Sequence, residues 1–161
     1  MGGGADLADR HRHAMLAWMC RLCSGPEFMK PGFTPGIRRE VRVVVSEDMC
    51  PAFDGAVVHR VYSTWSMVHH MELAARRVLV DFLEEDEEGI GTRVCVNHKS
   101  PASVGSEVTV RAELVDVRHQ VVVCHVSAWH GERLLGEGEQ VQRVFQKDAI
   151  SEIFERSEQG G

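Results

Sequence analysis

The chain has 161 residues, the size of one ordinary domain, and this length is enough to bury about 70% of the surface that the unfolded form exposes. Hydrophobic residues make up 43% and charged residues 26%, which is typical of a globular protein and excludes a fibrous or wholly disordered one. The net charge of -6 argues against nucleic acid as a partner, because a protein that binds phosphate backbones needs excess positive charge.

Residues 1–29 are predicted to form a helical extension and a linker. Three prolines and three glycines between residues 25 and 36 interrupt any helix. The early acids Asp6 and Asp9 argue against a secretory signal, and no apolar run reaches the about 18 to 20 residues of a membrane helix. We therefore expect a cytoplasmic protein with no membrane partner. The helical pattern before the linker rests on Leu7, Met15, Leu16, Met19 and Leu22.

The five cysteines are an odd number without a framework spacing, which predicts reduced thiols. Cys20 and Cys23 form a CxxC pair preceded by His11 and His13. A second metal-binding pair at finger spacing and a βαβ pattern are both missing, so we expect no metal and no cofactor. We expect Cys20 and Cys23 to be ordinary residues of an amphipathic helix, and metal binding or redox chemistry by the pair is the alternative.

One strand and one long helix are predicted after the linker. Residues 41–45 are rich in valine and predict a strand, followed by an irregular connection over residues 46–55. Residues 61–83 have apolar side chains at helical spacing, with Glu72 at the edge of the apolar arc, where we expect it to be half-buried. The acidic run at residues 84–89 predicts solvated surface, and its glycine, with Gly91, predicts a turn.

The remaining segments are short runs that alternate apolar and polar residues, joined by short turns that favour antiparallel pairing. Residues 148–161 are predicted to be a short helix and a tail. The order of one strand, one helix and four strands predicts an α+β domain at residues 30–147, with an antiparallel sheet wrapped on the helix. The four predicted strands are residues 92–99, 107–117, 121–129 and 134–145.

Three polar residues are candidates for chemistry, and each has a structural alternative. Thr64 stands where a helix N-cap is expected, Glu72 is able to reach solvent from the rim of the helix, and His98 points with the valines of its strand. Together they supply a hydroxyl, a carboxylate and an imidazole, which are the groups that acyl transfer uses. Burial among leucines would raise the pKa of Glu72 and make it a better base near neutral pH.

These residues resemble a known family. The chain carries a Thr at the helix entrance, a Glu eight residues later, and a His twenty-six residues after the Glu, in a strand of the form GTxxxVxH that begins at Gly91 and Thr92. This pattern, within residues 30–146, is similar to that of hotdog-fold acyl-CoA thioesterases of the fluoroacetyl-CoA thioesterase-like group.

The resemblance implies a hotdog fold and hydrolysis of a small or medium acyl-CoA by a homodimer or a dimer of dimers, with the active site close to the subunit interface. By this analogy Thr64 and Glu72 attack the thioester carbonyl or activate water, and His98 acts as acid and base or orients the carbonyl. Gly91, Thr92 and Trp65 are expected to bind the substrate. Selectivity for a fluorinated acyl group is not carried over, because bulky Trp65 follows the Thr.

His69 and His70 fall outside the apolar arc of the helix and are expected at the surface or at an interface. A hotdog hydratase or dehydratase is the first rival function, although its typical Asp and His pair on the helix and preceding loop is missing. The second rival is a non-catalytic module that binds acyl-CoA or another small ligand.

Overall fold

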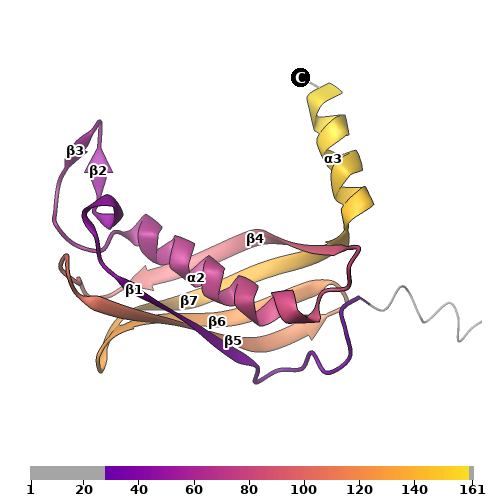
Figure 1. The fold of residues 1–161 in the computed structure, drawn as a ribbon, viewed down its shortest axis with the longest axis horizontal. Helices are drawn as coiled ribbons and strands as arrows, with labels where there is room; N and C mark the ends of the chain where they lie inside the picture. The colour runs from indigo at the N-terminus through magenta and orange to yellow at the C-terminus, as the bar shows by residue number, and fades with distance from the viewer. Residues whose placement is uncertain (1–27, 160–161) are drawn as a thin grey trace, which may run out of the picture.

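The computed structural model describes residues 28–159, so the predicted N-terminal helix and the Cys20 and Cys23 pair lie outside the described residues. One long helix lies across one face of an antiparallel sheet, and a second helix projects from the end of the sheet (Figure 1). The elements are β1 (Arg38–Val44), β2 (Ala52–Phe53), β3 (Ala56–Val57), α2 (Thr64–Leu79), β4 (Glu87–His98), β5 (Glu107–Arg118), β6 (Val121–His130), β7 (Arg133–Gln146) and α3 (Lys147–Gln159).

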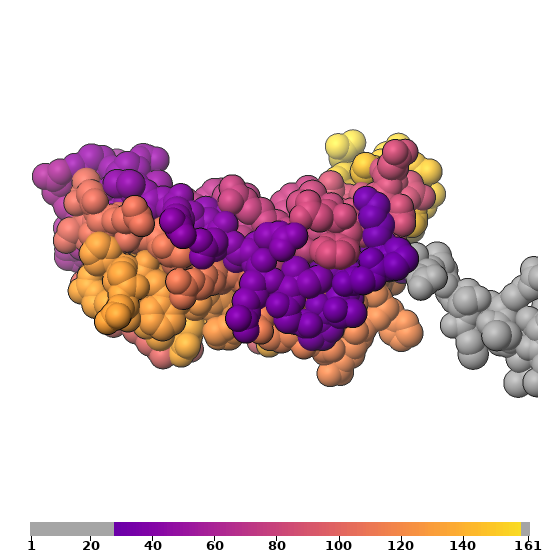
Figure 2. Space-filling view, turned by 60° about the horizontal axis from the view of Figure 1, so that its bottom comes forward, coloured from indigo at the N-terminus to yellow at the C-terminus, as the bar shows by residue number. Residues whose placement is uncertain are grey.

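The large sheet has five antiparallel strands in the order β1-β5-β6-β7-β4, so that β1 and β4 are its two edges. The α+β prediction of a long helix packed against an antiparallel sheet is confirmed. In Figure 2 the indigo atoms of β1 and of the segment before it lie between the magenta helix and the orange strands. β4, at the other edge, has no further strand beside it in the described part of the chain.

The core lies between α2 and the sheet. The predicted alternation in β5 is confirmed, because Val108, Val110, Ala112 and Leu114 are buried while the residues between them are partly or fully exposed. Small residues on the helix allow the sheet to approach closely. The buried side chains of α2 are Ser66, Met67, His70, Met71, Ala74, Ala75, Val78 and Leu79.

The helix and the hairpin before it differ from the prediction. α2 begins at Thr64 and is followed by a 3₁₀ turn at Val80–Phe82, so it is shorter than the predicted range of 61–83. The connection predicted as irregular contains the β2–β3 hairpin, turned by Asp54 and Gly55, both with positive φ. An Asp-Gly pair is the typical sequence for such a two-residue turn, and this signal was overlooked.

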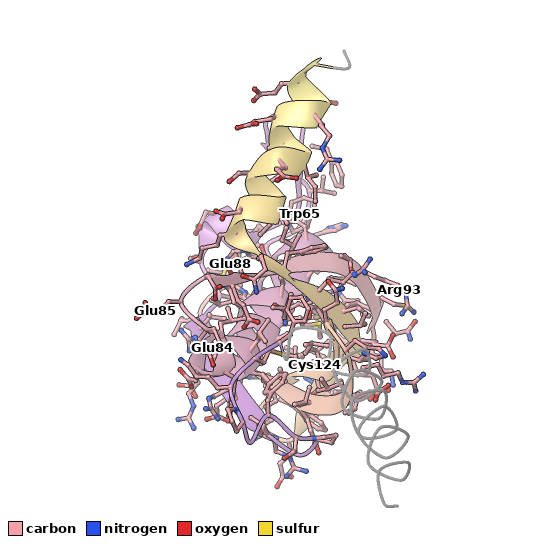
Figure 3. All side chains as sticks on the ribbon, turned by 90° about the vertical axis from the view of Figure 1, so that its right-hand side faces the viewer. Trp65, Glu84, Glu85, Glu88, Arg93 and Cys124 are labelled. Atoms are coloured by element: carbon pink, nitrogen blue, oxygen red, sulfur yellow. The ribbon has the colours of Figure 1, made fainter. Side chains whose placement is uncertain are left out.

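The acidic run at residues 84–89 was predicted to be solvated surface, and this prediction holds for only part of it. Glu84 and Glu85 are exposed and are labelled in Figure 3, but Glu87 is 3% exposed and lies at the start of β4. The Glu87 carboxylate accepts hydrogen bonds from the backbone N–H of Met29 and that of Glu84. Gly89 likewise lies inside β4, and the predicted turn at this point is wrong.

We expect Glu87→Ala to lower the free energy of unfolding by about 1 to 3 kcal/mol, because the buried N–H of Met29 and the partly buried N–H of Glu84 lose their acceptor. Denaturant unfolding of the full chain measures this loss. Glu85→Ala, at an exposed position two residues earlier, is the matched control and should change stability by no more than about 0.5 kcal/mol. Equal stability of the two variants would contradict the anchoring role of Glu87.

Candidate functional site

The entrance of α2 is capped by the residue before Thr64. The Ser63 Oγ accepts a hydrogen bond from the backbone N–H of Ser66 at 3.1 Å, which satisfies one of the free donors of the first turn. Thr64 is the first helical residue and its side chain is exposed. The structural alternative for Thr64, an N-cap, is therefore wrong, and its hydroxyl is available for another partner.

That partner is His98, which ends β4 beside the helix entrance. Thr64 Oγ1 and His98 Nδ1 are 3.0 Å apart, and His98 Nε2 is 3.1 Å from the carbonyl oxygen of Ser100. A carbonyl only accepts, so Nε2 carries the proton and Nδ1 of the neutral ring accepts from the Thr64 hydroxyl. A hydroxyl, a basic nitrogen and a group that orients the ring therefore form one chain of hydrogen bonds, which is the arrangement of an activated nucleophile.

A pocket of about 270 Å³ opens over this pair. Its outer wall includes Phe53 from β2 and Trp65 from α2, whose rings meet edge to face with centroids 5.6 Å apart. Both aromatic side chains are largely exposed. The expected position of Trp65 beside the candidate site is thus observed, and Phe53 is a lining residue that the sequence analysis did not find.

Glu72 lies elsewhere on the helix. It is eight residues from Thr64, a rise of about 12 Å along α2, and it does not line the pocket over His98. Its carboxylate sits against the backbone of Gly91, where an added Cβ would collide with Oε1. Glu72 is exposed, as in the alternative in which it reaches solvent, and is not half-buried among leucines, because β4 is the edge of the sheet and no strand within residues 28–159 covers that side.

Gly91 and Thr92 also lie away from the pocket. The register of β4 against β7 shifts between Gly91 and Arg93, which leaves Thr92 in a bulge. The Thr92 hydroxyl donates to the carbonyl oxygen of Val141 at 3.3 Å. Within a single chain, Thr64 and His98 therefore lie together at the helix entrance, whereas Glu72 lies with Gly91 at a separate place along α2.

His70 does not lie at the surface, and that interpretation is wrong. It is 7% exposed, and its Nδ1 is 2.7 Å from the hydroxyl oxygen of buried Tyr62, directly before the helix entrance. Burial lowers the pKa of His70, and neighbouring His69 lowers it further. His69 is exposed, as expected. The Tyr62 and His70 pair therefore fixes the segment that leads into Thr64.

A larger groove of about 800 Å³ lies on the opposite face of the sheet, far from Thr64. Its arginines are paired with carboxylates, as in the bidentate contact of Arg38 with Glu113. Its walls contain no hydroxyl bonded to a histidine among the hydrogen bonds of residues 28–159. Charge pairing and stacking of Arg111 on Trp129 fit a solvated sheet face better than a reaction site.

No group of three metal-ligating side chains capable of holding an ion occurs in the described part of the chain. Between residues 28 and 159, no helix is long and apolar enough to cross a membrane. The functional groups at these two positions are the hydroxyl of Thr64, the imidazole of His98 and the carboxylate of Glu72.

Comparison with known proteins identifies the family. The family model described as fluoroacetyl-CoA-specific thioesterase (FlK) matches residues 45–148, which is more than half of the chain. The chain belongs to this family. A fluoroacetyl-CoA thioesterase from Streptantibioticus cattleyicolor is 37% identical over 85 residues, which cover 53% of this chain and 61% of that relative. The match therefore spans less than two thirds of the relative's length.

Solved structures agree with the thioesterase family and establish the fold. A hypothetical protein from Thermus thermophilus, described as a thioesterase superfamily member, is 34% identical with a TM-score of 0.77, over 80% of this chain and 96% of that one. A hot-dog-like protein from Thermanaerovibrio acidaminovorans is 23% identical with a TM-score of 0.70, over 79% and 93% of the two chains. The predicted hotdog fold is confirmed.

Proposed function

We propose that the protein is an acyl-CoA thioesterase that hydrolyses small or medium acyl groups and that residues 30–147 form its catalytic domain. The observation that carries this proposal is the Thr64 hydroxyl bonded to an imidazole that Ser100 orients, in a chain of the thioesterase family. The pocket of about 270 Å³ above this pair supports a small acyl group. We also propose a cytoplasmic location, which the free thiols of Cys50, Cys95 and Cys124 support.

Thr64 is the nucleophile in the first step. His98 Nδ1 accepts the hydroxyl proton as Thr64 Oγ1 forms a bond to the thioester carbonyl carbon. The carbon–sulfur bond then breaks, and the departing CoA sulfur receives that proton from His98. The products of this step are free CoA thiol and an acyl ester on Thr64.

Glu72 is the base in the second step. Its carboxylate takes a proton from water while the water oxygen attacks the ester carbonyl carbon. The bond from that carbon to Thr64 Oγ1 breaks, and the proton that Glu72 took from water passes through His98 to Thr64 Oγ1, which restores the Glu72 carboxylate and the Thr64 hydroxyl. The acid is released and the enzyme is restored. This role needs Glu72 to approach an acyl group that a single chain holds about 12 Å away along the helix.

A homodimer removes this separation. β4 is a twelve-residue edge strand, and its outer backbone groups are free to pair with a second copy. If two β4 strands pair antiparallel about the midpoint between Val94 and Cys95, Gly91 falls opposite His98 of the partner subunit. Glu72, which lies against Gly91, then faces the Thr64 and His98 pair across the interface.

Release of free thiol from a panel of acyl-CoA thioesters tests the function. We expect turnover of short acyl groups by the parent protein and losses of about 10²- to 10⁴-fold in Thr64→Ala, Glu72→Gln and His98→Ala. Intact-mass spectrometry of Glu72→Gln should detect an acyl adduct on Thr64, because only the second step is blocked. Glu85→Ala, at an exposed position that does not line the pocket, serves as the folded control.

Two results would contradict the proposal. Binding of CoA thioesters without thiol release from any of them would indicate a binding module. Turnover undiminished in all three variants would mean that the reaction takes place elsewhere.

A further inference from the structure

The C-terminal helix α3 has an apolar face that no other element of the described chain covers. Ile150, Ile153 and Phe154 lie at helical spacing on one side of α3, and the last two are 46% and 58% exposed. Figures 1 and 3 show the helix standing clear of the sheet. A helix of 13 residues is only marginally stable in water, so its apolar face needs a surface to pack on.

A second exposed apolar surface surrounds the mouth of the pocket over Thr64. Its four side chains come from the β2–β3 hairpin, from the residue after the hairpin and from the first turn of α2. They are Phe53, Val57, Val58 and Trp65, and each is 45% to 61% exposed. Phe53 and Trp65 also line the pocket itself. These four side chains are called the hairpin patch below.

The apolar face of α3 and the hairpin patch lie at opposite ends of α2. The hairpin patch is beside the first turn of α2, which is 16 residues and about 24 Å long. α3 begins beside the last turn, because the backbone N–H of Lys147 donates to the carbonyl oxygen of Asp86 at 2.8 Å, and Gly89, shortly after Asp86, lies against Leu79. In Figure 1 both α3 and the hairpin rise from the side of the sheet that carries α2. The two surfaces therefore do not meet within one chain.

The dimer proposed above brings the two surfaces together. The pairing of two β4 strands about the midpoint between residues 94 and 95 sets Glu87 opposite Ala102 of the partner subunit. Within each chain Glu87 pairs with Gln146, the residue before α3. The carbonyl oxygen of Ala102 accepts from the backbone N–H of Tyr62, between the hairpin and α2. α3 of one subunit therefore stands next to the hairpin patch of the other, and the two-fold axis repeats the contact.

The apolar area at these two contacts is that of a specific interface. Aromatic side chains bury about 150 to 250 Å² each, so the three half-exposed aromatic side chains of the two surfaces each offer on the order of 100 Å². With the aliphatic side chains added and both copies of the contact counted, roughly 1,000 Å² is available to be buried. A specific interface buries about this much or more, and the pairing of the β4 strands adds to it.

We propose that α3 docks on the hairpin patch of the partner subunit and covers the outer wall of that subunit's pocket. The inference rests on the dimer of the function proposed above. The apolar face of α3 packs on Phe53 and Trp65, which removes these side chains from water. The Thr64 and His98 pair then lies in a site with less solvent, where its hydrogen bond is electrostatically stronger.

Photo-crosslinking of the full chain tests the contact directly. p-Benzoylphenylalanine in place of Phe154 inserts on irradiation into C–H bonds that it touches. We expect a covalent dimer on a denaturing gel, with the cross-link mapped by mass spectrometry to residues 52–65 of the other chain. The same amino acid in place of Glu155, on the polar side of α3, is the matched control and should not give this product.

The strength of the dimer gives a second measurement. Phe154→Ser should raise the dissociation constant about 10- to 100-fold, because an aromatic anchor is lost at both copies of the contact. Glu155→Ser introduces the same side chain at the next position and should leave the dissociation constant unchanged. Sedimentation of the two full-length variants over a range of protein concentrations measures both values.

A cross-link within one chain, a cross-link to another part of the partner, or none at all would overturn the docking of α3. Equal dissociation constants for the parent and the two serine variants would overturn it as well. Thr64→Ala should cross-link like the parent, so docking is measured in protein that releases no thiol. Thiol release by the parent without the cross-link refutes docking alone, and the cross-link without thiol release from any thioester refutes the catalytic function alone.

Discussion

Two inactive variants should restore activity when they share a dimer. In the proposed dimer each site takes Glu72 from one subunit and Thr64 with His98 from the other. A mixed dimer of Glu72→Gln and Thr64→Ala therefore contains one intact site and one doubly altered site. Co-expression of the two chains with different tags should give about a quarter of the parental activity for random pairing in a C₂ dimer. Activity after sequential purification on both tags measures the mixed dimer alone.

The control for this experiment combines two variants whose altered residues come from the same subunit in each site. Thr64→Ala and His98→Ala alter the same half of each site, so their mixed dimer contains no intact site and should stay inactive. A site complete within one chain predicts that no combination of inactive variants recovers. Recovery by the control pair and the test pair alike would point to exchange or contamination by parent protein.

Gly91→Ala should abolish most activity while the protein stays folded. The added methyl group would occupy the position of the Glu72 carboxylate, so the base must leave its place. Gly91 is not among the glycines with positive φ, and alanine is therefore compatible with the backbone of β4. We expect kcat to fall about 10²-fold, as for a displaced general base, with a melting temperature equal to or above that of the parent.

Steady-state thiol release and thermal melting check this result. Asn97→Ala, on the outward face of the same strand, is the control and should leave both quantities unchanged. Parental turnover by Gly91→Ala would mean that the contact between Glu72 and β4 has no part in the reaction.

Local patterns predicted that Thr64 and His98 face one cleft, and the structure brings the two side chains into contact. Alternation along the strand places His98 with Val94 and Val96 on the side of α2, and the element order brings the end of that strand to the start of the helix. The resemblance to the thioesterase family then selected these two residues together with Glu72, because spacing alone does not establish a site. The same periodicity correctly assigned the buried face of β5, and the short turns correctly predicted the β5–β6 and β6–β7 hairpins. The expected pairing of β4 with β5 is wrong, because β4 lies at the far edge beside β7 and β1 lies beside β5.

The wrong predictions concern side chains whose burial depends on a segment distant in the sequence. A helical wheel gives the direction of Glu72 but not that β4 is the sheet edge, so its exposure was not predictable from the helix alone. Glu87 looked like one more solvated acid until Met29, 58 residues away, was found to donate to it. His70 is buried because Tyr62, which precedes the helix, supplies a partner that no helical pattern encodes.

The free edge of β4 also has a quantitative consequence for the enzyme in solution. If each working site requires two chains, dilution below the dissociation constant of the dimer removes activity without unfolding any chain. The rate per chain then rises with total protein concentration and reaches a plateau, so that the abundance of the protein sets its specific activity.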